Sequence, residues 1–167
     1  AAIDAKIRQE LRSWLRELIE RVGITSIFVT HDQDEAIEVA DEIMIINQGR
    51  VEQKGTPWDI YKEPKTPFVA SFIGESTVIA SAGELKGFEA AVNKHATRAL
   101  IRPEYIELGS EHDFPVLSAT ETGIVRHLHF RGSEWLVEVE VKGHKLITYR
   151  SLEKETLHPG QQVRVLV

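Results

Sequence analysis

The sequence predicts an α/β segment followed by an all-β domain of the OB type. Residues 1–76 alternate between helix-period and strand-period apolar patterns, as α/β folds do. Residues 77–167 consist instead of short β-rich runs separated by glycines and prolines. We therefore expect two domains, residues 1–76 and 77–167, with the boundary near Glu75 and Ser76.

Composition and charge narrow the possible partners. Of the 167 residues, 42% are hydrophobic and 28% are charged, which is typical of a globular protein in water. No stretch approaches the roughly 20 apolar residues of a membrane span and no signal-peptide pattern is present, so we expect a cytoplasmic location. Residues 77–167 carry 11 basic and 12 acidic residues, a balance that argues against nucleic acid as a partner.

A run of apolar residues that ends in a histidine organises the first domain. The continuous apolar run Ile27 to Val29 is typical of a strand buried on both faces, which we expect to end at Thr30. Asp32 can cap the next helix, and Glu35, three residues on, can complete a capping box. His31 would then lie at the carboxyl end of a strand and beside a helix amino terminus, where an anion is favoured.

Both candidate site residues of this domain also have plain structural interpretations. A histidine that follows a strand is more often structural or solvated than functional. A hydrolytic dyad of His31 and Asp32 is disfavoured, because adjacent side chains rarely orient to relay a proton. Asp4 precedes a predicted helix, and by spacing alone its simplest role is that of N-cap.

The other elements of the first domain follow from apolar spacing, turns and caps. The turn Asn47-Gln48-Gly49 predicts a hairpin, and Thr56-Pro57 and Thr66-Pro67 each place a capping threonine before a proline at the first helical position. The expected elements are helices over residues 5–22, 33–40, 58–62 and 68–73, a buried strand over residues 42–46 and its hairpin partner over residues 50–54.

Alternating short strands define the second domain. Val137, Val139 and Val141 alternate with Glu138 and Glu140, as in a strand with one buried face. Five or six such strands in a domain of this size suit a small OB-type barrel. The expected strands cover residues 98–102, 116–119, 123–130, 134–141, 145–150 and 162–167.

The side chains of the second domain are compatible with other functions. Its basic residues could bind an oxyanion, although surface charges paired with nearby glutamates are the simpler interpretation; these residues are Arg102, Arg126, Arg131, Lys145 and Arg150. Phe130, Trp135 and Tyr149 are the aromatic residues that could stack on a nucleic acid. His127 and His129 would share one face of a strand, but no third ligand is evident, so no metal site is expected.

Together these motifs resemble the ATP-binding subunits of ABC importers that carry a trailing transport-associated OB (TOBE) domain. Ala2-Ile3-Asp4-Ala5 resembles the D-loop of that family, and Val29-Thr30-His31-Asp32 resembles its histidine switch. The segment Leu100 to Glu104 resembles the "IRPE" segment of the TOBE domain. The run from Val29 to Pro57 is most similar to sulfate/thiosulfate import subunits, and maltose-type, spermidine-type and iron-type subunits share much of it.

The resemblance implies a remnant of an ABC ATPase domain followed by a regulatory TOBE domain. His31 would contact the γ-phosphate of ATP and the attacking water, and Asp4 would lie where two ATP-binding subunits meet around two nucleotides. The implied ligands are ATP and Mg²⁺ in the intact subunit. The implied partners are a second copy of the subunit and membrane permease subunits, at the inner face of the cell membrane.

Several motifs of the family do not occur in this sequence. There is no Gly-x-x-x-x-Gly-Lys-Ser/Thr phosphate loop, no "LSGGQ" signature and no strand that ends in Asp-Glu. In the family these motifs precede the D-loop, so we expect a truncated ATPase domain that alone neither binds ATP tightly nor hydrolyses it. The alternative is a free-standing OB-like regulatory or oxyanion-binding module without ATPase function. We also expect residues 1–76 to fold poorly by themselves, because their strands would expose unpaired edges.

Overall fold

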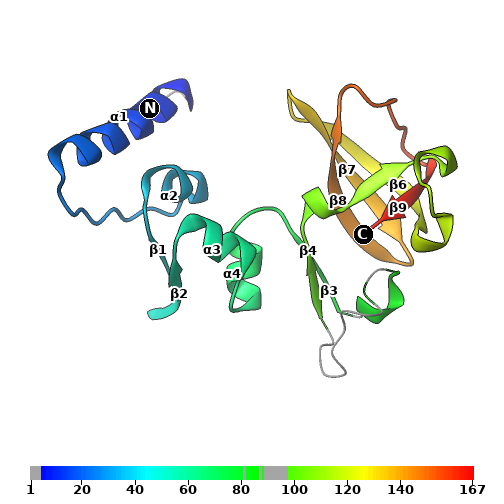
Figure 1. The fold of residues 1–167 in the computed structure, drawn as a ribbon, viewed down its shortest axis with the longest axis horizontal. Helices are drawn as coiled ribbons and strands as arrows, with labels where there is room; N and C mark the ends of the chain where they lie inside the picture. The colour runs from blue at the N-terminus through cyan, green and yellow to red at the C-terminus, as the bar shows by residue number, and fades with distance from the viewer. Residues whose placement is uncertain (1–4, 81, 87, 89–97) are drawn as a thin grey trace. The chain divides into compact units, whose positions relative to one another are not determined.

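The computed structural model describes residues 5–80, 82–86, 88 and 98–167. The chain divides into two compact units, Ala1–Gly74 and Glu75–Val167. Figure 1 labels the elements of each unit and colours them from blue at the N-terminus to red at the C-terminus. Asp4, one of the two predicted site residues, lies outside the described residues. None of the helices in the described ranges is long and apolar enough to cross a membrane.

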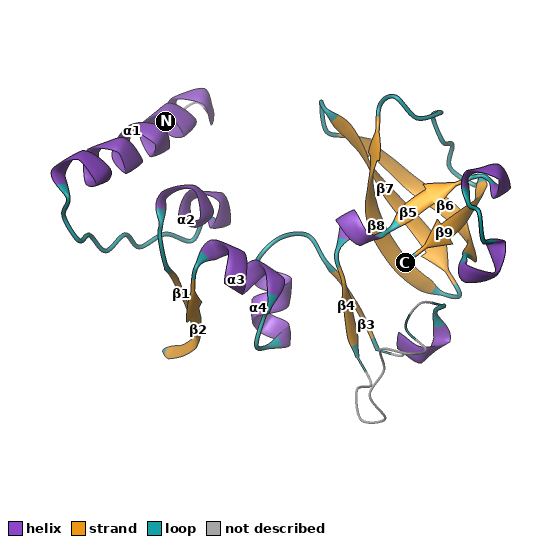
Figure 2. Ribbon diagram, in the orientation of Figure 1, coloured by secondary structure: helices purple, strands orange, loops and turns teal. Residues whose placement is uncertain are grey.

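The first unit combines helices with one β-hairpin. In the part that the structure describes, its elements are α1 (Ala5–Val22), α2 (Gln33–Val39), β1 (Ile43–Asn47), β2 (Arg50–Gly55), α3 (Pro57–Lys62) and α4 (Pro67–Phe72), all drawn in Figure 2. Gln48 and Gly49 take positive φ angles of 48° and 75° and close the predicted hairpin. Thr56 and Thr66 cap α3 and α4 as predicted, because each hydroxyl accepts a backbone N–H three residues on.

The prediction of a buried strand that ends at Thr30 is wrong. Residues 24–30 form no helix or strand, and the side chains of Ile27 and Val29 are 93% and 89% exposed. A strand requires a neighbour that pairs with its backbone groups. Among the described residues no strand pairs with this segment, because β1 pairs only with β2. The apolar run from Ile27 to Val29 therefore has the residue types of a buried strand, but such a run does not show that a neighbouring strand is present to pair with it.

The core of the first unit is small and leaves α1 largely uncovered. Its buried cluster comprises Ile43, Ile45, Ile60, Val69 and Ile73. The strand β1 is only half buried, since Met44 and Ile46 are 51% and 62% exposed, so the prediction of a buried strand over residues 42–46 is wrong. The apolar stripe of α1 is also exposed at Ile7, Leu11, Trp14, Leu18 and Val22.

The second unit is mostly β and contains a curled antiparallel sheet. The strand order of that sheet is β5 (Glu107–Gly109), β9 (Gln162–Leu166), β6 (Glu121–Phe130), β7 (Glu134–Val141) and β8 (His144–Ser151). A separate pair joins β3 (Thr77–Ile79) and β4 (Ala99–Ile101). Short 3-10 turns are η1 (Ala82–Glu84), η2 (Pro103–Tyr105), η3 (Glu111–Asp113) and η4 (Leu117–Ala119). This arrangement agrees with the predicted OB-like domain.

Alternation along β7 places the predicted valines in the core. Val137, Val139 and Val141 are fully buried, and Lys142 and Gly143 form the tight turn into β8 with φ angles of 49° and 82°. The prediction of a strand over residues 116–119 is wrong. These residues contain η4 instead, because the carbonyl of Leu117 accepts both the backbone N–H and the hydroxyl of Thr120.

Side chains of β8 join it to the segment around β5. The Thr148 hydroxyl lies 2.6 Å from the Ile106 carbonyl oxygen and 3.0 Å from that of Pro103. Arg150 donates through Nη1 to the Leu108 carbonyl at 2.8 Å. β5 and β8 are the two terminal strands of the sheet and do not pair through backbone hydrogen bonds. The side-chain bonds of Thr148 and Arg150 connect them instead.

Candidate functional site

His31 lies on an exposed bend directly before α2. Asp32 caps α2 as predicted: its Oδ1 accepts the backbone N–H groups of Asp34 at 3.0 Å and Glu35 at 3.2 Å. The hydrogen bond from the Glu35 N–H, together with the charge of Arg12, lowers the pKa of the Asp32 carboxyl, while burial acts in the opposite direction. His31 therefore directly precedes an ionised residue, Asp32, that caps α2.

The capping box predicted for Glu35 is wrong. The backbone N–H of Asp32 donates to the Thr30 hydroxyl at 3.0 Å, and that hydroxyl donates to Glu35 Oε2 at 2.7 Å. Thr30 thus replaces Glu35 as the acceptor for the N-cap residue. The two residues that flank His31 are held in one hydrogen-bonded chain.

This cap changes the anion site that the sequence predicts. Because Asp32 Oδ1 already occupies the N–H groups of Asp34 and Glu35, those donors face a carboxylate of the protein itself. An anion at this edge would therefore have to bind the His31 imidazole. In the described part of the chain His31 has no hydrogen bond or ion pair, so its ring nitrogens are open to a ligand.

Arg12 of α1 is the residue at this site that the sequence reasoning did not identify. Its Nη2 lies 3.2 Å from Asp32 Oδ2 and 3.7 Å from Glu35 Oε1, and its Nη1 lies 3.3 Å from Glu38 Oε2. The acidic character of residues 32–38 was a signal that a cation must face them. The sequence alone does not choose among Arg8, Arg12 and Arg16 for that role.

The other candidates lie in the second unit and are not assembled into one site. The His127 and His129 rings have centroids 6.2 Å apart, and no group of three or more potential metal ligands is present within the described ranges. The rings of Phe130 and Trp135 pack on each other with centroids 5.2 Å apart. The Tyr149 hydroxyl is engaged with Glu75 at 3.2 Å.

Four of the five basic residues considered for oxyanion binding fall into two groups. Arg126 and Arg131 form exposed ion pairs with Glu140 and Glu75, as expected of surface charges. The surface interpretation is wrong for Arg102 and Arg150, which are 4% and 8% exposed. The bonds of Arg150 to backbone carbonyls give it a structural role at the edge of the sheet.

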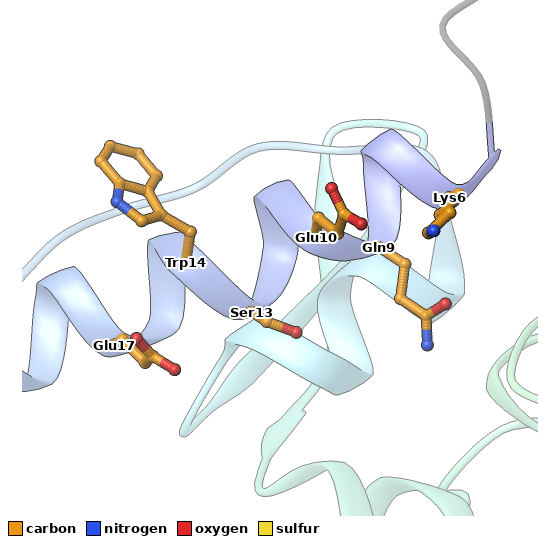
Figure 3. A pocket seen from close by; sticks show the side chains of 6 residues that line it. All are labelled: Lys6, Gln9, Glu10, Ser13, Trp14 and Glu17. Atoms are coloured by element: carbon orange, nitrogen blue, oxygen red, sulfur yellow. The ribbon is translucent and has the colours of Figure 1, made fainter.

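A shallow surface hollow lies along α1, with residues of one helix as its walls. Figure 3 shows the ring of Trp14 extending away from the helix, and this side chain is 56% exposed. The lining residues are Lys6, Gln9, Glu10, Ser13, Trp14 and Glu17. His31 is not among the residues that line this hollow.

Comparison with known proteins identifies the class to which the second unit belongs. Residues 99–167 match the TOBE domain family. The match covers the second unit from residue 99 onward, and the curled sheet of this unit agrees with the OB-like fold that the strand pattern predicted.

The similarity to relatives extends along nearly the whole chain. It is 44% identical, over 99% of its length, to the sulfate/thiosulfate import ATP-binding protein CysA of Synechocystis sp., of which it covers 48%. It is 41% identical over 98% of its length to the protein of the same name from Synechococcus elongatus, of which it covers 47%. A protein of that name from Brucella melitensis is 55% identical over 78 residues, or 47% of this chain and 22% of the relative. The chain spans about half the length of the curated relatives it matches, and these matches confirm the resemblance to importer ATP-binding subunits.

Proposed function

We propose that the chain forms part of the ATP-hydrolysing subunit of an importer that carries sulfate, thiosulfate or a related anion. The observation that carries this proposal is the 44% identity over 99% of the chain to a sulfate/thiosulfate import ATP-binding protein. The first unit would then be a portion of an α/β ATPase domain, and the TOBE domain would be its regulatory extension. The subunit would work at the inner face of the cell membrane.

In this proposal His31 contacts the γ-phosphate of ATP and positions the attacking water. Its exposed ring, free of protein partners in the described residues, supports this role, because an imidazole can donate to a phosphate oxygen or hold a water. The fixed positions of Thr30 and Asp32 limit where the ring can lie. ATP with Mg²⁺ is the substrate of the intact subunit, and the other phosphate contacts would come from outside these 167 residues.

The proposed partners are a second copy of the ATP-binding subunit and membrane permease subunits. Asp4, which precedes α1 in the sequence, is the proposed contact with the second copy. Permease contact would fall mainly to the part of such a subunit that precedes the D-loop. No role for nucleic acid is proposed.

The chain by itself should neither bind ATP tightly nor hydrolyse it. It contains no phosphate-binding loop, so no nest of backbone N–H groups or lysine is available for the β- and γ-phosphates. A turnover assay on the purified chain with MgATP should give only background release of phosphate. Hydrolysis that His31→Ala abolishes would contradict this expectation.

A chimera tests the function that the chain would have in an intact subunit. This chain would replace the matched part of the Synechocystis relative, and the product would be assayed for ATP hydrolysis and for uptake of labelled sulfate in a strain deficient in sulfate import. We expect hydrolysis that is lost in the His31→Ala variant and retained in a control variant of the exposed His112. A folded chimera that does not hydrolyse ATP would refute the proposed function.

A second candidate function rests on the separate core of the TOBE domain. That core is formed entirely within the second unit, by residues such as Val139, Leu146 and Val165, so the domain could act as a ligand-binding module. Titration of the chain with sulfate, molybdate or an oligonucleotide, followed by the fluorescence of Trp135, would test this. A saturable response to any one of them, without ATPase activity in the chimera, would favour the module.

A further inference from the structure

Arg12 stands apart from the other charged residues of the first unit. Its side chain is only 15% exposed, and its buried Nε has no hydrogen-bond partner among the described residues, so the guanidinium depends on the carboxylates at its two terminal nitrogens. By contrast, Arg16 is 43% exposed and pairs with Glu20 and Asp41, which are 64% and 91% exposed. Exposed ion pairs of that kind contribute little to stability. A partly buried guanidinium that contacts several carboxylates instead restrains both its own helix and the segment that carries the carboxylates.

Two of the carboxylates that Arg12 contacts also fix the residues on either side of His31. Asp32 uses Oδ2 for Arg12 and Oδ1 for the cap of α2. Glu35 uses Oε1 for Arg12 and Oε2 for the Thr30 hydroxyl. One guanidinium therefore contacts both carboxylates that hold the turn around His31, from Thr30 to the first turn of α2.

α1 connects this contact to the other predicted site residue. The helix begins at Ala5, immediately after Asp4 in the sequence, and runs without interruption past Arg12 to Val22. An uninterrupted α-helix moves as a rigid body over such a short distance. A displacement at the start of α1 would therefore move the Arg12 guanidinium and, with it, Asp32 and Glu35.

We propose that Arg12 is a positioning residue for His31. Through its contacts with Asp32 and Glu35, Arg12 links α1 to the turn that carries the histidine. This inference rests on the proposed function of His31 at the γ-phosphate. Arg12 itself would not touch the nucleotide. Its loss would leave the carboxylates of Asp32, Glu35 and Glu38 without their shared cation, and these like charges would repel one another.

The test compares Arg12→Gln, Arg12→Lys and Arg16→Gln in the chimera described above. Arg16→Gln is the matched control, because it removes a guanidinium from the same helix without touching Asp32 or Glu35. We expect Arg12→Gln to lower kcat for ATP hydrolysis by roughly 10- to 100-fold with little change in KM, as misplacement of a reacting group does. Arg12→Lys should recover part of the loss, since it restores the charge but not the planar geometry of the guanidinium.

Hydrogen exchange at the amides of Asp34 and Glu35 gives a second measurement that does not need activity. Arg12→Gln should speed exchange at these two capped amides in the folded chimera, while Arg16→Gln should not. Equal kcat and equal exchange in the two variants would overturn the positioning role and leave the proposed function intact. If the chimera is inactive even with Arg12 present, the proposed function fails. The exchange data then still decide whether Arg12 holds the turn.

Discussion

Glu121 shows how a single buried carboxylate fixes a loop to the barrel. Its side chain is 8% exposed, and Oε1 accepts the Lys142 ammonium at 2.8 Å and the backbone N–H of Lys86 at 3.0 Å. Lys142 also donates to the Glu84 carbonyl at 2.7 Å. The cluster therefore ties residues 84–86 to β6 and to the β7–β8 turn. Burial acts to raise the pKa of Glu121, but the bonds from Lys142 and Lys86 outweigh it and lower that pKa.

Replacement of Glu121 should therefore cost stability in a pH-dependent way. We expect Glu121→Gln to reduce the free energy of unfolding at neutral pH by about 1–3 kcal/mol, because Lys142 and the Lys86 N–H lose a charged acceptor. Since the pKa is lowered in the folded chain, this stabilisation is complete above the ordinary value of 4.5 and is lost as the pH falls through the lowered value. Urea titrations of both proteins at neutral and acidic pH measure this.

The control for that experiment is Glu140→Gln. Glu140 pairs with Arg126 at the surface, where both side chains are more than a third exposed, so its loss should change the free energy of unfolding by less than about 0.5 kcal/mol. An equal effect of the two variants, or a Glu121 effect that does not change with pH, would contradict the assignment of Glu121 as the buried anchor.

Tyr149 provides a second titration at the alkaline end. Burial, followed by the charge and hydrogen bond of Glu75, raises the pKa of its phenol to about 12. The protonated phenol is thus favoured in the folded state, and its stabilisation is present below pH 10 and is lost as the pH rises through about 12. An ultraviolet titration should show one tyrosine ionising late, and Glu75→Gln should bring it back toward the ordinary value. The late step should persist in Tyr105→Phe, which removes a 66% exposed tyrosine.

At the scale of elements, local signals predicted what local interactions determine. The hairpin turns at Gln48-Gly49 and Lys142-Gly143 and the threonine caps of α3 and α4 each need only a few consecutive residues, and the structure contains all of them. The β7 strand was predicted over the residues that form it, because alternation and a tight turn specify both its register and its end.

Non-local interactions account for what the sequence did not predict. The segment 24–30 has strand-type residues but no partner in the described chain, and β3 and β5 are too short to show a pattern of their own. At the candidate site, the cap by Asp32 could be predicted, whereas its contact with Arg12, 20 residues earlier, depends on how α1 packs on α2. Whether Asp4 has its predicted role stays a prediction.

Gly123 is the position where the packing of three strands is tightest. A Cβ atom at Gly123 would lie 2.7 Å from Cγ2 of Val139 on β7 and 2.8 Å from Cγ2 of Val165 on β9. Valine side chains are stiff and these two are fully buried, so neither can move aside without displacing its strand. Glycine therefore permits β6 to approach both neighbours in the core.

We expect Gly123→Ala to destabilise the second unit by about 1–3 kcal/mol through overpacking. The matched control is Gly83→Ala, where a Cβ atom would meet no heavy atom of the described residues within 4 Å. Thermal unfolding followed by circular dichroism should show a lower Tm for the first variant only. A Gly123→Ala protein as stable as the parent would mean that β6 can shift without cost to the barrel.

At the scale of the whole molecule, the two units differ in how completely each buries its apolar surface. Among the described residues, thirteen form the buried cluster of the second unit, from Ile79 to Val165, whereas five form that of the first. The first unit also exposes the uncharged segment 24–30 and the apolar stripe of α1. A segment rich in β-branched and aromatic residues with unpaired backbone groups is prone to pair with other chains.

The two units should therefore behave differently when separated. A fragment of residues 75–167 should unfold in one cooperative transition, because its core lies within it. A fragment of residues 1–74 should unfold without a sharp transition and associate at high concentration, and Ile27→Lys with Val29→Lys should suppress that association by adding charge to the unpaired segment. Sedimentation and thermal melts of both fragments measure this. A monomeric, cooperatively melting 1–74 fragment would show that its small core, with the Arg12 contacts between α1 and α2, is sufficient for folding.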